Sequence, residues 1–253
     1  MIIYNTKDLF KVHLGKKPIL VTFPFSGGNS YSYRGLVEHM EDTFDIICTE
    51  LPGRNSLLAM PLENNISKLV DFVLDTWIPP LNTDCQYIFY GHSMGGLMAF
   101  LAAKKIVKSN RLHPSHIVIS GRGAPSIARK HVYHNLPSSE FWKKIQEMGG
   151  MSEELLRNDD IKEYFEPILR SDFAAVENYK HTYTTPLEVP ISVFIGSEEN
   201  ISDHAVLQWQ EETTVPVNFH KLTGNHFFIF DHIPEIVSYM KATITKSNLL
   251  YSH

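Results

Sequence analysis

One serine of the chain has the surroundings of an activated nucleophile. Ser93 lies in the sequence Gly91-His92-Ser93-Met94-Gly95, which matches the pattern G-x-S-x-G. The apolar run CQYIFY precedes it, and the helix-compatible stretch GLMAFLAAKKIV follows it. A serine between a strand and a helix occupies a strained turn that exposes its hydroxyl, and the glycines let the two elements approach. The pattern therefore predicts a serine that attacks acyl carbonyl groups.

A serine nucleophile needs a general base, which in the order serine, acid, histidine comes late in the chain. His226 follows the last expected strand directly, and Gly224 and Asn225 before it supply a turn. A loop at this place would present the imidazole over the edge of the sheet. His226 is therefore the predicted base, and His232 is the alternative.

The acid that orients the imidazole is expected in the loop after the penultimate strand, at residues 196–203. Three carboxylates lie there. Asp203 follows Ser202 at the start of the next expected helix, so it is interpreted as an N-cap or first-turn residue. Glu198 and Glu199 remain as candidates, and their spacing alone does not separate them.

Two backbone amides are expected to bind the oxyanion that forms during attack. The start of the helix after Ser93 directs the Met94 amide and the positive end of the helix dipole at this oxygen. The second donor is expected in the loop FPFSGGNS, which follows the early strand at residues 18–23. Ser26 is the predicted donor, with Phe25 as the next choice.

Other kinds of site are poorly supported. The early loop has neither G-x-G-x-x-G nor G-K-[ST], so it does not predict a phosphate-binding loop. The chain has no H-E-x-x-H, no paired cysteines and no dense histidine and carboxylate cluster, so no metal site is expected.

The elements that must position these residues alternate between short apolar runs and longer helix-compatible stretches. This alternation is typical of a mainly parallel sheet with helices on both faces. Strands are expected at residues 18–23, 44–49, 87–90, 116–120, 191–195 and 217–222, and helices at 31–40, 66–77, 95–108, 203–212 and 234–244.

One segment breaks the alternation. Residues 125–183 contain several helical patterns and no convincing strand. Because loops at the carboxyl ends of strands surround the ligand site of such sheets, we expect a helical lid. The chain is therefore predicted to be a single domain over residues 1–253 with a lid insertion at 125–183.

The composition excludes several classes of protein. With 43% hydrophobic and 20% charged residues, the chain is too apolar to be disordered. Its 23 Lys and Arg against 28 Asp and Glu give a net charge of −5, which argues against binding to nucleic acids or anionic membranes. We find no signal-peptide pattern and no apolar run of the roughly 18 residues that a membrane helix needs. Cys48 and Cys85 are interpreted as buried free thiols, so we expect a cytoplasmic protein.

Taken together, these segments resemble the type II, or editing, thioesterases that accompany nonribosomal peptide and polyketide synthases. The resemblance covers nearly the whole chain and rests on FPFSGGNSYSYRGL, ELPGR, GHSMGG, the region from MGGMSEELL to ILRSDF, and GNHFFI. Such a combination is far more specific than G-x-S-x-G alone.

The resemblance implies an α/β-hydrolase fold and a triad in which Ser93 matches the nucleophile and His226 the base. The acid of the family is usually aspartate, and its position aligns with Glu199, so the chain departs from the pattern there, with Glu198 as the substitute. Ser26 matches the position of the second oxyanion donor. Phe25 stands where many relatives have histidine, which removes a polar group from the pocket mouth.

The resemblance also implies a substrate and a partner. The enzyme would hydrolyse acyl or aminoacyl thioesters stalled on the phosphopantetheine arm of an acyl or peptidyl carrier protein, which docks near the lid. It would need no cofactor of its own and would be a monomer. Two alternatives remain open at this stage: a carboxylesterase or lipase-like enzyme for small free esters, and an inactive α/β-hydrolase that serves as a binding module.

Overall fold

A computed structural model describes most of the chain, namely residues 2–4, 17–78, 86–109, 113–127, 132–149, 154 and 157–250. Cys48 is a buried free thiol, as predicted, and burial raises its pKa to about 12. Cys85 lies outside the described residues.

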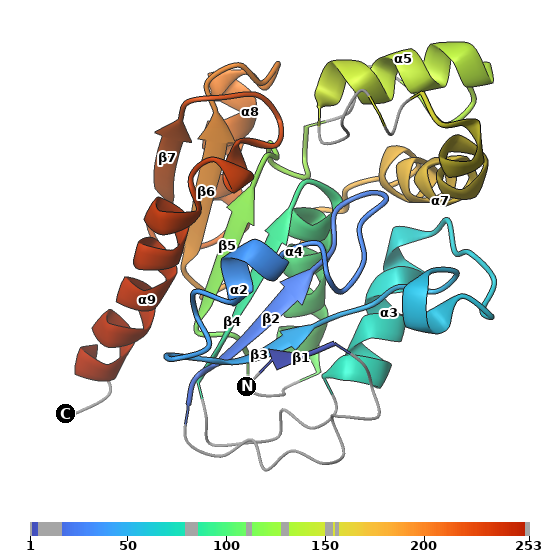
Figure 1. Cartoon of the computed structure of the whole chain (residues 1–253). Coiled ribbons are helices and arrows are strands. Elements are labelled where there is room, and N and C mark those ends of the chain that lie inside the picture. The colour runs from blue at the N-terminus through green and yellow to red at the C-terminus, as the bar shows by residue number, and fades with distance from the viewer. Residues whose placement is uncertain are drawn as a thin grey trace.

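Seven strands form one sheet in the order β1-β3-β2-β4-β5-β6-β7, and every pairing among them is parallel (Figure 1). Their bounds are β1 Ile2–Ile3, β2 Ile19–Phe23, β3 Asp45–Cys48, β4 Tyr87–His92, β5 His116–Ser120, β6 Ile191–Gly196 and β7 Asn218–Leu222. The predicted parallel sheet is confirmed, and six strands end within two residues of their predicted bounds. The sequence prediction missed β1, because two residues are too few to form a pattern.

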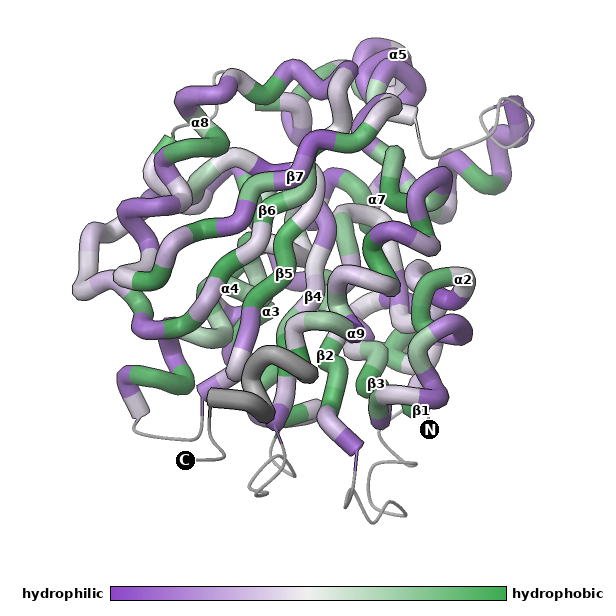
Figure 2. Tube along the Cα trace, turned by 90° about the vertical axis from the view of Figure 1, so that its left-hand side faces the viewer, coloured by the Kyte–Doolittle hydropathy of each residue, from purple (hydrophilic) through white to green (hydrophobic). Residues whose placement is uncertain are grey.

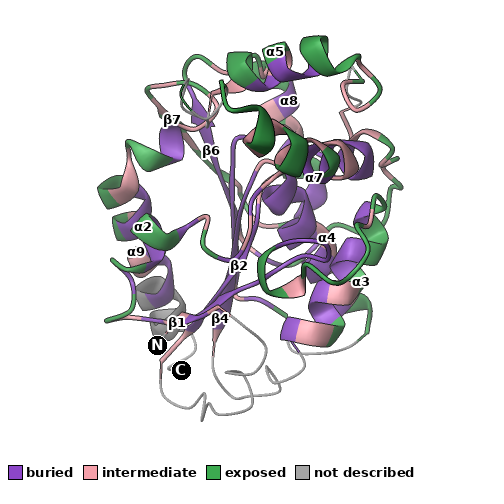
Figure 3. Ribbon diagram, turned by 45° about the vertical axis from the view of Figure 1, so that its right-hand side comes forward, coloured by how far each residue is buried: buried purple, intermediate pink, exposed green. Residues whose placement is uncertain are grey.

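Helices cover both faces of this sheet (Figure 3). They are α2 Arg34–Val37, α3 Ile66–Trp77, α4 Met94–Lys108, α8 Asp203–Leu207 and α9 Ile233–Leu250, with 3-10 turns η1 Asn55–Leu57, η3 Gln208–Glu212 and η4 Phe228–Phe230. One apolar cluster joins α3 and α4 to the sheet, and a second cluster joins α2 and α9 to its other face.

Strand β2 shows why these apolar runs become strands. Successive side chains of a strand point to opposite faces. Ile19, Val21 and Phe23 belong to the cluster under α3 and α4, whereas Leu20 belongs to the cluster under α2 and α9. Since both faces are covered, every residue of β2 is buried, and most of the strands are nearly continuous hydrophobic runs, much of which is green in Figure 2. The edge strand β7 differs, because its residues are exposed or half-buried.

The segment between β5 and β6 carries two helices, α5 Ser138–Met148 and α7 Asp159–Glu177, and no strand among its described residues. Figure 1 places both helices beyond the end of the sheet toward which the strands point. Phe141 and Trp142 of α5 pack with Phe173 of α7 in a separate apolar cluster, while Ala175 of α7 joins the main core. The helical content agrees with the sequence pattern; the lid role and the single domain stay predictions.

Candidate active site

Ser93 occupies the turn between β4 and α4. Its φ of 53° and ψ of −112° lie outside the usual regions for a residue with a side chain. Such a conformation costs about 1–3 kcal/mol and persists only where the surroundings impose it. The Ser93 amide donates a hydrogen bond to the Ser120 carbonyl oxygen at 2.8 Å, which ties the turn to the end of β5. The residue is partly exposed, as a nucleophile must be.

The glycines on either side of Ser93 permit this turn. A Cβ atom on Gly91 would overlap the Gly95 carbonyl group, so a larger residue would push α4 away from β4. A Cβ atom on Gly95 would overlap the carbonyl oxygen of Phe23. The start of α4 therefore lies directly against the end of β2, where the loop with Ser26 begins.

His226 forms a short hydrogen bond with an acid from the loop after β6. Its Nδ1 lies 2.5 Å from Glu199 Oε1, and the other carboxylate oxygen accepts the Gly196 amide at 2.8 Å. The Glu199 side chain is 2% exposed, and that of His226 is 22% exposed. Because an ionised carboxylate only accepts hydrogen bonds, Glu199 takes the Nδ1 proton, and Nε2 is the ring nitrogen left to act as a base.

The competing residues lie elsewhere. Glu198 is exposed, and the structure pairs Glu199 with His226, so geometry separates the two glutamates that spacing could not. Asp203 stands in the first turn of α8, where Ser202 is the N-cap, in agreement with the sequence interpretation. The His232 ring hydrogen-bonds the side chain and the carbonyl oxygen of Thr223.

The ring of His92 connects His226 to the turn at Ser93. The centroids of the two imidazoles are 4.6 Å apart. His92 is fully buried, and its Nδ1 is 3.0 Å from Ser120 Oγ. Burial, and secondarily the charge of His226, hold the pKa of His92 well below its ordinary value, so this ring stays neutral. No hydrogen bond joins Ser93 Oγ to His226 in the described structure; such contacts often tighten only when substrate binds.

Phe25 forms an apolar wall beside these histidines. Its ring centroid lies 5.9 Å from that of His92 and 5.2 Å from that of Phe227, the residue that follows the predicted base. The ring centroid of Phe230 lies 6.3 Å from that of Phe25, and Phe230 is exposed. Phe25 is thus part of an aromatic cluster next to His226.

The two predicted oxyanion donors have free amides. Neither Met94 N–H nor Ser26 N–H donates a hydrogen bond to a described residue. Ser26 lies in a turn in which the Gly28 amide donates to the Phe25 carbonyl oxygen at 2.8 Å. Gly27 has a φ of +77°, as the third residue of a type II turn requires. Within the described residues both amides are therefore left without an acceptor, as the predicted role requires.

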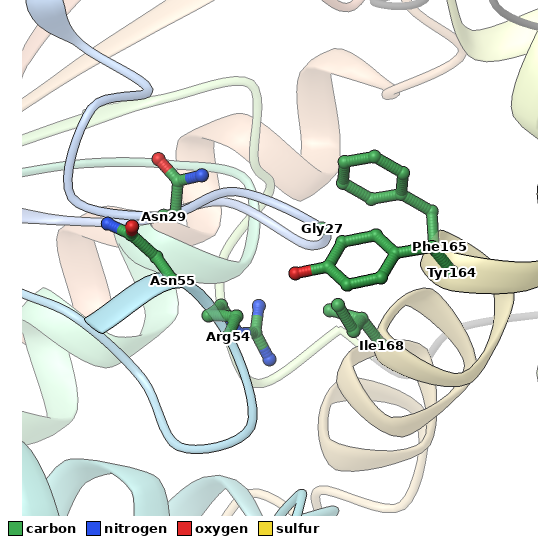
Figure 4. A pocket seen from close by; sticks show the side chains of 7 residues that line it. All are labelled: Gly27, Asn29, Arg54, Asn55, Tyr164, Phe165 and Ile168. Carbon is green, nitrogen blue, oxygen red and sulfur yellow. The ribbon is translucent and has the colours of Figure 1, made fainter. Parts of the chain in front are cut away.

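Two residues beside this turn were assigned no role from the sequence. Arg54 and Asp172 form a buried ion pair that also contacts Gly27 and Gly28. They lie in the segments ELPGR and ILRSDF, which contributed to the family resemblance, and that was the only signal the sequence offered. Arg54 of this pair lines a cavity of about 140 Å³, and Tyr164 of α7 is also part of the lining (Figure 4).

Among the described residues, no group of three or more His, Cys, Asp or Glu could hold a metal ion. In the same part of the chain, no helix is both long and apolar enough to cross a membrane. The chemistry available at this edge of the sheet is that of a serine, an imidazole with a buried carboxylate, and two free amides.

Comparison with known proteins places this geometry in context. The thioesterase domain family matches residues 18–244. The gramicidin S biosynthesis protein GrsT of Aneurinibacillus migulanus is 28% identical over 231 residues, covering 90% of each chain. The medium-chain S-acyl fatty acid synthase thioesterase of Rattus norvegicus is 29% identical over 234 residues, covering 90% of this chain and 86% of that protein.

A solved structure agrees with these matches. The crystal structure of ClbQ from the colibactin NRPS/PKS pathway superposes with a TM-score of 0.85 at 26% identity, covering 93% of this chain and all of that one. The matched thioesterases share the α/β-hydrolase fold, so the predicted fold class is confirmed. The resemblance to thioesterases of nonribosomal peptide and polyketide pathways is confirmed as well.

Proposed function

This chain belongs to the thioesterase domain family, and we propose that it is a serine thioesterase that edits nonribosomal peptide or polyketide synthesis. Its substrates are acyl or aminoacyl groups stalled as thioesters on the phosphopantetheine arm of a carrier protein. The observation that carries the proposal is the Glu199–His226 pair beside the strained turn of Ser93. The relatives from gramicidin S and colibactin biosynthesis support the class of pathway.

In the first half of the reaction, Ser93 Oγ attacks the thioester carbonyl carbon while His226 Nε2 takes the hydroxyl proton. The carbonyl oxygen becomes an oxyanion, which accepts hydrogen bonds from the Met94 and Ser26 amides. Glu199 stabilises the imidazolium through Nδ1. The carbon–sulfur bond then breaks, the sulfur takes the proton from His226, and the pantetheine thiol leaves an acyl-Ser93 ester.

In the second half, a water molecule gives a proton to His226 Nε2 as its oxygen attacks the acyl-Ser93 carbonyl. A second oxyanion forms between the same two amides. When it collapses, Ser93 Oγ leaves and recovers its proton from His226, and the free acid is released. Every proton is returned, so the cycle needs no cofactor.

The proposal extends to the partner and the setting. The arm of an acyl or peptidyl carrier protein reaches Ser93 from the side of the sheet where α5 and α7 lie (Figure 1). We propose that the enzyme acts as a cytoplasmic monomer.

The rat relative favours a second candidate, because its name assigns it to medium-chain fatty acid synthesis. In that case the same residues would hydrolyse fatty acyl thioesters. The two functions predict different substrate preferences at an identical catalytic centre, so acyl groups of both kinds must be compared.

The experiment measures hydrolysis of acetyl, aminoacyl and medium-chain fatty acyl groups on a phosphopantetheinylated carrier domain, and of a matched oxygen ester. Wild type is compared with Ser93→Ala. We expect turnover of the short acyl or aminoacyl carriers, and a loss of about 10⁶-fold with Ser93→Ala, since removal of a nucleophile abolishes the covalent path.

Three other results would contradict the proposal, and each would indicate a different function. Preference for the fatty acyl carrier would move the function to fatty acid release. Faster turnover of the free ester would favour a carboxylesterase, and the absence of any Ser93-dependent hydrolysis would leave a binding module.

A further inference from the structure

A buried ion pair joins the helical segment to the core beside the active site. Arg54 Nη1 and Nη2 each lie 2.7 Å from one oxygen of Asp172, so the contact is bidentate. The two side chains are 3% and 0% exposed. Burial by itself lowers the pKa of Arg54, but the charge and hydrogen bonds of Asp172 raise it, with a net increase. Arg54 therefore faces Asp172 as a charged guanidinium group.

The same pair contacts the backbone of the turn that carries Ser26. The Gly27 amide donates to Asp172 Oδ2 at 2.8 Å, and Arg54 Nη1 donates to the Gly28 carbonyl oxygen at 3.1 Å. Asp172 belongs to α7, and Arg54 follows β3, so three segments distant in sequence meet at this turn. Figure 4 shows Gly27 and Arg54 across the pocket from α7, which carries Tyr164, Phe165 and Ile168.

These contacts determine where the Ser26 amide points. Because a peptide unit is planar and trans, the Ser26 N–H points opposite to the Phe25 carbonyl, which accepts from Gly28. The next peptide is held by the hydrogen bond from Gly27 to Asp172. With both peptides held, the turn cannot rotate without breaking a hydrogen bond, and the Ser26 N–H faces away from the turn without an acceptor among the described residues.

A buried ion pair is an unfavourable choice if its only role is to accept one amide hydrogen bond. The desolvation free energy of the two charges offsets much of their electrostatic attraction. A bidentate guanidinium–carboxylate contact adds what a neutral acceptor lacks, which is a fixed direction. The two parallel hydrogen bonds from the Arg54 guanidinium group fix the position of the Asp172 carboxylate, which in turn holds the Gly27 amide. This explains why the pair stands at a turn that must be placed accurately.

We propose that Asp172 and Arg54 are positioning residues for the oxyanion hole, holding the Ser26 amide in place only while α7 is docked on the core. The inference rests on the proposed function, because it assumes that Ser26 binds the oxyanion formed at Ser93. It makes the helical segment part of the catalytic apparatus as well as a cover over it.

The test compares Asp172→Asn with Glu177→Gln. Glu177 is a matched control, because it is another carboxylate of α7 with a side chain that is 1% exposed, but it contacts Tyr133 and His134 instead of the turn. Steady-state kcat and KM are measured on a small acyl thioester, together with the affinity of an alkyl boronic acid that forms a tetrahedral adduct with Ser93. Covalent labelling of Ser93 gives the fraction of active enzyme.

We expect Asp172→Asn to lower kcat per active site by about 10²-fold, as misplacement of a donor does, with KM nearly unchanged. The affinity of the boronic acid for Asp172→Asn should fall by a similar factor. Glu177→Gln should leave kcat per active site and this affinity within about threefold of wild type. Arg54→Lys keeps the positive charge but cannot form the bidentate contact, so kcat and the affinity of the boronic acid should both fall, but by less than in Asp172→Asn. It carries the test if Asp172→Asn does not fold.

The proposal is overturned if kcat per active site falls no further in Asp172→Asn or Arg54→Lys than in Glu177→Gln, or if the boronic acid binds all of them equally. A loss that disappears when rates are corrected for the labelled fraction also overturns it. These results differ from failure of the proposed function, in which the wild type itself shows no Ser93-dependent hydrolysis.

Discussion

The molecule contains two histidine–glutamate pairs that are almost identical as isolated contacts. His226 Nδ1 lies 2.5 Å from Glu199, and His134 Nδ1 lies 2.5 Å from Glu177. The glutamate side chains are 2% and 1% exposed, and the histidines 22% and 17%. One pair stands at the end of the sheet, and the other joins the segment before α5 to α7.

Their surroundings differ. Glu177 also accepts the amides of Tyr133 and His134, so its hydrogen bonds fasten a chain segment to the last turn of α7. The His226 ring packs instead against His92, next to the turn of Ser93. A short contact between imidazole and carboxylate therefore does not identify a catalytic site. The groups that the other side of the imidazole contacts distinguish the two pairs.

The largest expected difference is between His226→Ala and His134→Ala. Loss of the base should lower kcat/KM for a carrier-bound thioester by about 10⁴- to 10⁶-fold. His134→Ala should leave kcat/KM within about threefold and act on stability alone, because His134 contacts no residue of the proposed triad. Initial rates and thermal unfolding of both variants check this, and a comparable loss of activity in the two would break the comparison.

Replacing the acids should give the next largest effect. Glu199→Gln removes the charge that fixes the His226 tautomer and should lower kcat by about 10³- to 10⁴-fold. The exposed neighbour supplies a matched control, since Glu198→Gln should change kcat by less than about twofold. If Glu198→Gln were the damaging variant, the acid would have been assigned to the wrong residue.

The smallest expected effect concerns His92, the neutral imidazole that packs against His226. The folded pKa of His92 lies well below 6.5, so the unfolded chain binds a proton that the folded chain excludes. Its contribution to the free energy of unfolding is thus complete above about pH 6.5 and declines as the pH falls toward the folded pKa.

Urea unfolding between pH 5 and 8 checks this sign. His92→Gln should flatten the decline, by at most about 1.4 kcal/mol per pH unit for one proton. His220, whose pKa burial also lowers, contributes with the same sign and should preserve part of the slope. An unchanged slope in His92→Gln would mean that the pKa of His92 is the same in the folded and the unfolded chain.

Much of the fold could be predicted, because the sheet is covered on both faces and most of its strands are apolar runs that stand out in the sequence. The short helices were harder to predict from the sequence. The expected helix at 31–40 is helical only over Arg34–Val37, and the expected helix at 203–212 divides into α8 and the 3-10 turn η3. At such lengths, packing against the core decides the conformation more than local preference does.

The sequence by itself predicted the parallel sheet and the serine turn, and it proposed His226 as the base, because each inference uses residues that are neighbours in the chain. Tertiary structure decided which glutamate meets His226, since adjacent residues on a loop point in different directions. It alone joined Arg54 to Asp172 across 118 positions. Such a contact exists only after α7 has docked, and no local pattern of spacing encodes it.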